Sequence, residues 1–184
     1  MKRFILFIFI SLWFVSTAMF CFRKPRDDSH DPLPPATQDG RGTFACYVND
    51  KAFIGRPYNC FFQYDPQNGR YYMALEGIDN DYERNHHYPN WIAIEGSFST
   101  WQIPNDTIIP LGKATDSTDS VMGLAIINTY VCTTDSIFSG EVHITRFDLE
   151  NYIISGTFWF DVYNGYAHDT LHVRDGRFDV RISI

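Results

Sequence analysis

Strict alternation of apolar and polar side chains near the C-terminus is the feature that most limits the fold of this chain. In "NYIISGTFWFDVYN", residues 151–164, every second residue belongs to one apolar face. A period of two is that of a β-strand with one buried face, and it does not fit a helix. The side chains predicted to point inward are those of Ile154, Gly156, Phe158, Phe160 and Val162.

The same period recurs along the rest of the C-terminal region. "EVHIT", "TLHVR" and "RFDVRI" each alternate, and they place Val142, Ile144, Leu171, Val173, Phe178, Val180 and Ile182 inward. Turn-forming residues separate these segments at Asp148–Asn151, at Asn164-Gly165 and at Asp175-Gly176, a pair favoured in two-residue hairpins. We therefore predict a C-terminal antiparallel meander of four strands.

Six further strand-like segments precede the meander, and none has a helical period. They are "FACYVNDKAFI", "NCFFQY", "YYMALEGI", "WIAIEGSF", "TIIPLG" and "VMGLAIINTY". About ten short strands at this spacing predict an all-β fold, an antiparallel β-sandwich. The alternative is a closed up-and-down barrel like that of lipocalins.

The chain divides into three parts by composition. Residues 1–21 resemble a signal peptide, with a basic start followed by an apolar run. Residues 22–42 are rich in proline and polar residues, which predicts a tether with little apolar area to bury. Residues 43–184 form the predicted single β domain, about 140 residues and enough for one core.

Cys21 stands where the export signal ends, and three interpretations are open. As a lipoprotein, the chain would be cut before Cys21 and carry its lipid on that thiol. As a secreted protein, it would be cut after Ala18, which ends a triplet with small residues at both ends. Left uncut, the 19 residues from Phe4 to Phe22 are close to the roughly 20 that span a bilayer. All three place the β domain outside the cytoplasm, in the outer membrane or periplasm.

Charge and cysteine content limit the partners and the chemistry. The formal net charge is −7, and removal of the leader with Lys2 and Arg3 makes the remainder more acidic. An acidic surface repels nucleic acid, so we predict no nucleic-acid partner. Besides Cys21 the chain holds Cys46, Cys60 and Cys132, an odd number that is compatible with one disulfide in any of three pairings and one free thiol.

A near-repeat gives the candidate binding residues. "YMALEGI" and "WIAIEGS" share an aromatic residue, an alanine and a glutamate followed by glycine. Alternation places Met73, Leu75, Ile92 and Ile94 in the core. The other face then carries Tyr72, Glu76, Trp91 and Glu95, and Trp159 lies on the outward side of its own strand. Aromatic rings beside carboxylates suit a sugar or a peptide.

No catalytic motif accompanies these residues. The chain has no Gly-x-Ser-x-Gly, no His-Glu-x-x-His and no phosphate-binding glycine loop. We predict no catalytic residue, no metal site and no cofactor.

Three short motifs carry a resemblance to a known group of proteins. They are "GEVHITRFD" at Gly140–Asp148, "ISGTF" at Ile154–Phe158 and "GRFDV" at Gly176–Val180, and "GTFACYVNDKAF" after the proline-rich segment adds to them. Together they resemble a family of uncharacterised lipoproteins of Bacteroidota. The resemblance implies a β fold and an envelope location, and it supplies no activity or catalytic residues.

Five Asp-Ser or Asp-Thr triplets look like the O-glycan acceptors of exported proteins of that phylum. Composition alone leads us to expect about one such triplet. The candidate acceptors are Thr107, Ser117, Ser120, Ser136 and Thr170.

These observations predict a non-enzymatic, exported cell-envelope protein, anchored to the membrane by lipid and binding a glycan or an envelope protein on its β surface. Two alternatives remain. One is a small-ligand carrier whose barrel cavity is lined by Phe158, Phe160 and Phe178. The other is an enzyme that acts on envelope glycans.

Overall fold

Alternating sequences form strands throughout the part of the chain that the structure describes. The computed structural model describes residues 32–79, 89–113, 119–127 and 129–184. Those residues form no helix long and apolar enough to cross a membrane. The strands are β1 (Thr43–Val48), β2 (Lys51–Pro57), β3 (Phe61–Asp65), β4 (Arg70–Ile78), β5 (Trp91–Phe98), β6 (Thr107–Leu111), β7 (Ser120–Ile127), β8 (Tyr130–Thr133), β9 (Gly140–Asp148), β10 (Ile153–Asn164) and β11 (Asp169–Arg181).

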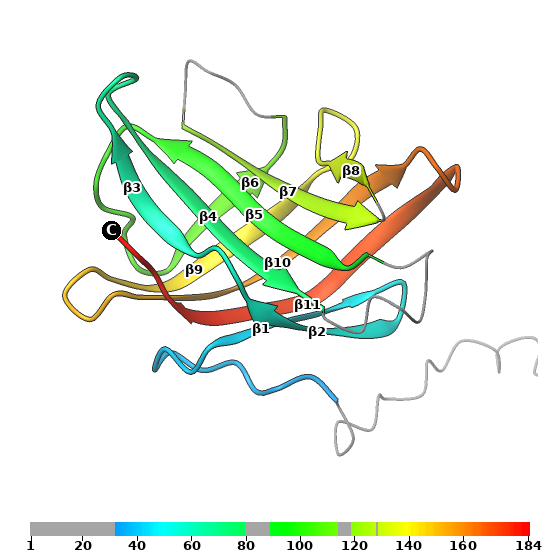
Figure 1. The fold of residues 1–184 in the computed structure, drawn as a ribbon, viewed down its shortest axis with the longest axis horizontal. Helices are drawn as coiled ribbons and strands as arrows, with labels where there is room; N and C mark the ends of the chain where they lie inside the picture. The colour runs from blue at the N-terminus through cyan, green and yellow to red at the C-terminus, as the bar shows by residue number, and fades with distance from the viewer. Residues whose placement is uncertain (1–31, 80–88, 114–118, 128) are drawn as a thin grey trace, which may run out of the picture. The chain divides into compact units, whose positions relative to one another are not determined.

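The strands pair in one sheet whose hydrogen bonds make a ring. The order is β2-β1-β11-β10-β9-β6-β7-β5-β4-β3, with β8 on β7 and an additional pairing of β2 with β4 (Figure 1). One junction joins β2 to β4, and the other joins β6 to β7 in parallel at Leu111 and Val121. The predicted all-β fold is confirmed. Two facing layers joined by short pairings are consistent with a sandwich and with a barrel-like arrangement.

The core lies between the layers and is filled by aromatic and aliphatic side chains. Every inward position predicted from alternation is buried, including all those of β9, β10 and β11. Phe158 packs against Phe44, Phe160 and Phe178 with ring centroids 5.4, 6.1 and 6.2 Å apart. These phenyl rings pack on one another, which does not favour their lining a ligand cavity.

The turn between β1 and β2 is set by two residues with positive φ. Asn49 (φ 46°) and Asp50 (φ 66°) form the two-residue loop between the paired Val48 and Lys51. Positive φ at both central positions is the type I′ geometry, whose twist matches that of the flanking strands, and Asn and Asp tolerate it.

The predicted hairpin turn at Asp175-Gly176 is instead a β-bulge inside one long strand. Phe158 of β10 pairs with Gly176 and Phe160 pairs with Val173, so β11 carries one extra residue there. Asp175 has a φ of 50°, the left-handed conformation that both a tight turn and a bulge use. Because strands on both sides of β11 continue past this point, the chain bends without reversing. The predicted four-strand meander is therefore three strands.

Glycine permits the close approach at the β2–β4 junction. Gly77 of β4 pairs with Pro57 of β2, and a methyl group on Gly77 would overlap the ring of Phe44. Gly55 of β2 faces the backbone of Gly77, and its added carbon would lie 3.1 Å from that backbone. Gly55 makes this approach tight, and Gly77 is the residue whose added carbon would overlap a buried ring.

The end of the proline-rich segment is docked on the domain, although the sequence predicted a free tether to residue 42. Residues 32–184 form one compact unit. Leu33 is buried with Ala45 and Tyr47. The Arg177 guanidinium donates to the carbonyl of Pro34 over 3.0 Å.

The carboxylate of Asp179 holds this docked segment. It accepts hydrogen bonds from the hydroxyls of Thr37 (2.6 Å) and Ser155 (2.7 Å). It also accepts from the backbone amides of Asp39, Gly40 and Arg41 over 2.7–3.1 Å. Burial raises the pKa of Asp179, but these hydrogen bonds to the charged form outweigh it and lower the pKa to about 2.

Gly77→Ala is expected to destabilise the fold by about 1–3 kcal/mol, because the added methyl overlaps a fully buried ring. Gly165→Ala, in the open β10–β11 loop with no atom near its added carbon, is the matched control. Urea unfolding followed by tryptophan fluorescence measures both. Equal midpoints for the two variants would contradict the account of the junction.

Asp179→Asn is expected to cost about 1–3 kcal/mol near neutral pH, because the amide NH₂ cannot accept the hydrogen bonds that the carboxylate accepts. The folded pKa is depressed, so this stabilisation is present above the ordinary value of 3.8 and is lost as the pH falls toward about 2. Unfolding free energies measured across this range should converge for parent and variant at low pH. Glu150→Gln, at an exposed turn, is the matched control and should change the stability near neutral pH far less.

Candidate functional site

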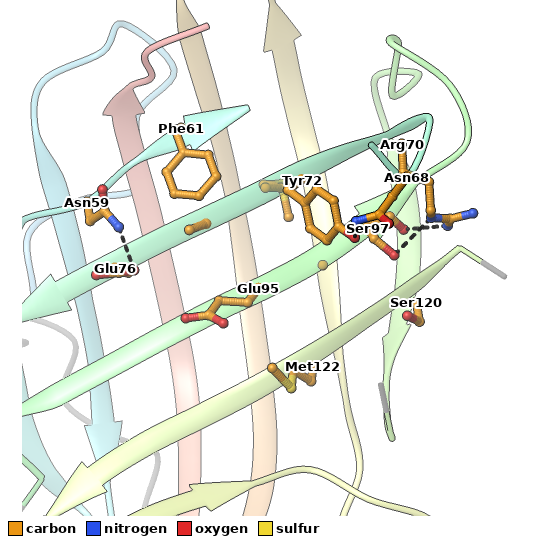
Figure 2. A pocket seen from close by; sticks show the side chains of 13 residues that line it. Asn59, Phe61, Asn68, Arg70, Tyr72, Glu76, Glu95, Ser97, Ser120 and Met122 are labelled. Carbon is orange, nitrogen blue, oxygen red and sulfur yellow. Dashed lines mark hydrogen bonds between the residues drawn. The ribbon is translucent and has the colours of Figure 1, made fainter. Parts of the chain in front are cut away.

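The candidate site is the outer face of four neighbouring strands, β3, β4, β5 and β7. A row of directly opposed residues crosses them, and consists of Phe61, Ala74, Glu95 and Met122. A second row of Tyr72, Ser97 and Ser120 lies beside it. These rows form the floor of a pocket of about 700 Å³, which we call the floor pocket (Figure 2). Its volume lies within the range typical of small-ligand sites.

The near-repeat in the sequence explains why the floor is hollow. The two motifs pair antiparallel, which sets Ala74 opposite Glu95 and Ala93 opposite Glu76. Each glutamate therefore faces a methyl group across the strand boundary. Ala74 lines the pocket, and its short side chain leaves room beside Glu95, whereas Ala93 beside Glu76 is fully buried.

The side chain of Glu76 is nearly enclosed, and only one of its two carboxylate oxygens has a hydrogen-bond partner. Its side chain lines the floor pocket although the residue is 4% exposed. Oε1 accepts a hydrogen bond from Asn59 Nδ2 at 3.1 Å, whereas Oε2 has no hydrogen-bond partner (Figure 2). Burial raises the pKa of Glu76; the Asn59 hydrogen bond opposes this, and the charge of Glu95 adds to it.

Glu95 shares this environment. It lies diagonally across the strand pair from Glu76, one row along the floor. Burial raises the pKa of its carboxyl as well. Two carboxyls that both resist ionisation on one floor are a feature of binding and catalytic sites more than of an ordinary solvent face.

The basic residue of the pocket is already engaged by other groups. Arg70 donates from Nε to Ser97 Oγ at 3.3 Å and from Nη2 to Asp119 at 3.1 Å. The Asp119 carboxylate thus balances the Arg70 charge, and it also accepts from the Ser99 amide at 2.7 Å. Neither interaction neutralises Glu76 or Glu95.

The structure brings together three of the five residues predicted to bind a ligand: Tyr72, Glu76 and Glu95. Trp91 lies beyond the pocket, at the opposite end of the strand pair. It pairs with Ile78, and its ring meets that of Tyr58 edge-on at 5.6 Å. Its Nε1 is buried without a hydrogen-bond partner.

Trp159 belongs to a second surface on β9, β10 and β11. Its Nε1 donates to Glu141 Oε2 at 3.3 Å, and the Arg174 guanidinium lies 5.3 Å from its ring. Both residues line a hollow of about 640 Å³ together with Trp159. The five predicted residues therefore do not form one site.

Sequence reasoning missed Asn59, Phe61 and Met122, which complete the floor pocket. Asn59 lies just before β3, Phe61 is the first residue of β3, and Met122 lies on β7. Alternation gives each strand its faces but does not say which strands are neighbours. The β5–β7 pairing crosses more than twenty residues, so no local signal predicts it.

The predicted modification sites lie at varied positions. Cys21 and Ser117 are outside the described residues. Ser136 is exposed, while Thr107 and Thr170 are half-buried, and Ser120 lies at the rim of the floor pocket. Their modification stays a prediction.

The three described cysteines are all free thiols, so the one disulfide that their number allowed is not formed among them. Cys46 and Cys132 are buried and Cys60 is half-buried. Burial raises the pKa of each thiol, so none is suited to act as a thiolate nucleophile.

Within the described ranges, no group of three or more His, Cys, Asp or Glu side chains is placed to hold a metal ion.

Comparison of the chain with protein-family models, with curated proteins and with solved structures gave no significant match. The geometry of the floor pocket therefore carries the functional argument.

Glu76→Gln is expected to raise the free energy of unfolding near neutral pH by about 0.5–1 kcal/mol, because it removes a buried charge and keeps an acceptor for Asn59. The folded pKa is raised, so the charge destabilises the fold only above the ordinary value of 4.5. The gain should vanish at lower pH and grow as the pH rises through this value. Thermal unfolding at several pH values checks this, and the exposed Glu150→Gln should show no such gain.

Proposed function

We propose that this chain is an exported, non-enzymatic protein of the cell envelope that binds a glycan in the floor pocket. The apolar leader and the resemblance to envelope lipoproteins support export. The single observation that supports binding is a pocket on the outer face that combines aromatic rings with an unsatisfied carboxylate oxygen.

The lining of the pocket matches the surface of a sugar. Phe61 and Tyr72 are half-buried rings on neighbouring strands, and such rings can pack on the apolar C–H face of a pyranose. Asn59, Glu76 and Glu95 supply amide and carboxylate groups for ring hydroxyls. A site that mixes apolar area with a few polar groups gains affinity from the first and orientation from the second.

The same geometry favours binding over glycoside hydrolysis. Hydrolysis uses two carboxyl groups that flank the scissile bond, one acting as acid and the other as base or nucleophile. Glu76 and Glu95 project from adjacent strands on the same side of one sheet. Both carboxyls would therefore approach a bound sugar from the side of the sheet.

The anchor in this proposal is a lipid on Cys21, and the segment docked by Asp179 lies close to it in sequence. The intact mass of protein extracted from native membranes is expected to correspond to a chain that starts at Cys21 and carries lipid. Cys21→Ser should release the protein into the soluble fraction. A mass without lipid would remove the anchor and leave the pocket proposal standing.

Tyr72→Ala is expected to weaken glycan binding about tenfold or more, because a ring that stacks on a ligand contributes about 1–3 kcal/mol by alanine substitution. Tyr163→Ala, an exposed ring on β10 remote from the floor, is the matched control. Binding is measured on an immobilised panel of neutral and amino-sugar oligosaccharides. Equal binding by parent and both variants would remove the floor pocket as the site.

A further inference from the structure

The described lining of the floor pocket contains more acidic than basic side chains. Among the described residues that line it, Arg70 is the one basic side chain, and it is paired with Asp119 at 3.1 Å. Glu76 and Glu95 both lie on the floor, and no other Lys, Arg or His is among the described residues that line it. A ligand that carries a positive charge would balance these carboxylates.

The buried oxygen of Glu76 shows where that charge is needed. The residue is 4% exposed and its Oε2 has no donor, which is a costly arrangement for a carboxylate. A hydroxyl of a neutral sugar would satisfy one lone pair and leave the charge in place. An ammonium group supplies three donors together with a positive charge, and can serve Glu76 and Glu95 at once.

We propose that the glycan bound in the floor pocket is an amino sugar with a free, unacetylated ammonium group, which Glu76 and Glu95 hold between them. This inference rests on the proposed function and specifies its ligand. The sugar ring then lies over Ala74, beside the rings of Phe61 and Tyr72, which also attract a cation through their π faces.

The breadth of the floor favours an amino sugar over a lysine side chain. Four strands contribute to it, and the short side chain of Ala74 lies between Phe61 and Glu95 in its central row. A lysine ammonium sits at the end of a long aliphatic stem and fits a deep channel. An amino group attached directly to a pyranose places the ring on the floor at the same time as the charge reaches the carboxylates.

Isothermal titration with three trisaccharides tests this proposal: a glucosamine trimer, its fully N-acetylated counterpart and a neutral glucose trimer. The solution is kept at low salt, at a pH where the amines are protonated and the carboxyls ionised. The glucosamine trimer should bind at least about tenfold more tightly than the other two. Glu76→Gln and Glu95→Gln should each abolish most of this preference, while Glu150→Gln should retain it.

The outcomes separate this inference from the proposed function. Equal binding of all three sugars, still weakened by Tyr72→Ala, would overturn the ammonium inference and leave glycan binding intact. No binding of any sugar on the panel would remove both. Binding of a lysine-containing peptide in place of the glucosamine trimer would show a cation site for another class of ligand and overturn the inference. Unfolding midpoints of the glutamine variants confirm that each is folded.

Discussion

Closure of the strand ring at β2 and β4 is the constraint on which the rest of the domain depends. The junction consists of the pairs Arg56–Ile78 and Pro57–Gly77, and Gly77 leaves space there for the ring of Phe44. Once it is formed, the inward residues of both layers share one core. Without it, β2 and β4 would each present unpaired backbone groups at an open edge. A single missing side chain thus links the aromatic core to the continuity of the sheet.

The same glycine connects the core to the candidate site. Gly77 follows Glu76, and the period of a strand sends neighbouring residues to opposite faces. The inward position must therefore be empty of side chain for Phe44 to pack, and the outward position carries the carboxylate of the floor pocket. Gly96 repeats this arrangement after Glu95, where its added carbon would lie 2.7 Å from Val121. The Glu-Gly pair that recurs in the sequence thus combines tight packing inside with charge outside.

Alternation predicted most of the fold because it depends only on neighbouring residues in the sequence. It identifies which face of each strand is buried. Met73, Leu75, Ile92 and Ile94 are inside as expected, and Tyr72, Glu76 and Glu95 share the outer face. What could not be predicted depends on distant partners. The pair Asp175-Gly176 predicts a turn, and only the pairing of β11 with strands on both sides shows that it is a bulge. The composition of residues 32–42 predicts a tether, and only their hydrogen bonds to the distant Asp179 carboxylate show that the segment is docked. Trp91 was expected at the site because it shares the outer face of its strand with Glu95. The register of the β4–β5 pair instead places it opposite Ile78, beyond the end of the floor pocket.

Two buried acids among the described residues show why the floor pocket is more than a solvated face. Asp179 and Glu76 are both almost fully enclosed, yet Asp179 has five donors and a depressed pKa, while Glu76 has one donor and a raised pKa. The chain therefore can satisfy a buried carboxylate where folding requires it. At Glu76 it leaves an oxygen without a partner beside a second acid, at a cost in stability. A polar group that lowers the stability of the fold in this way is typical of binding sites. Its missing hydrogen-bond partner is then supplied by the ligand.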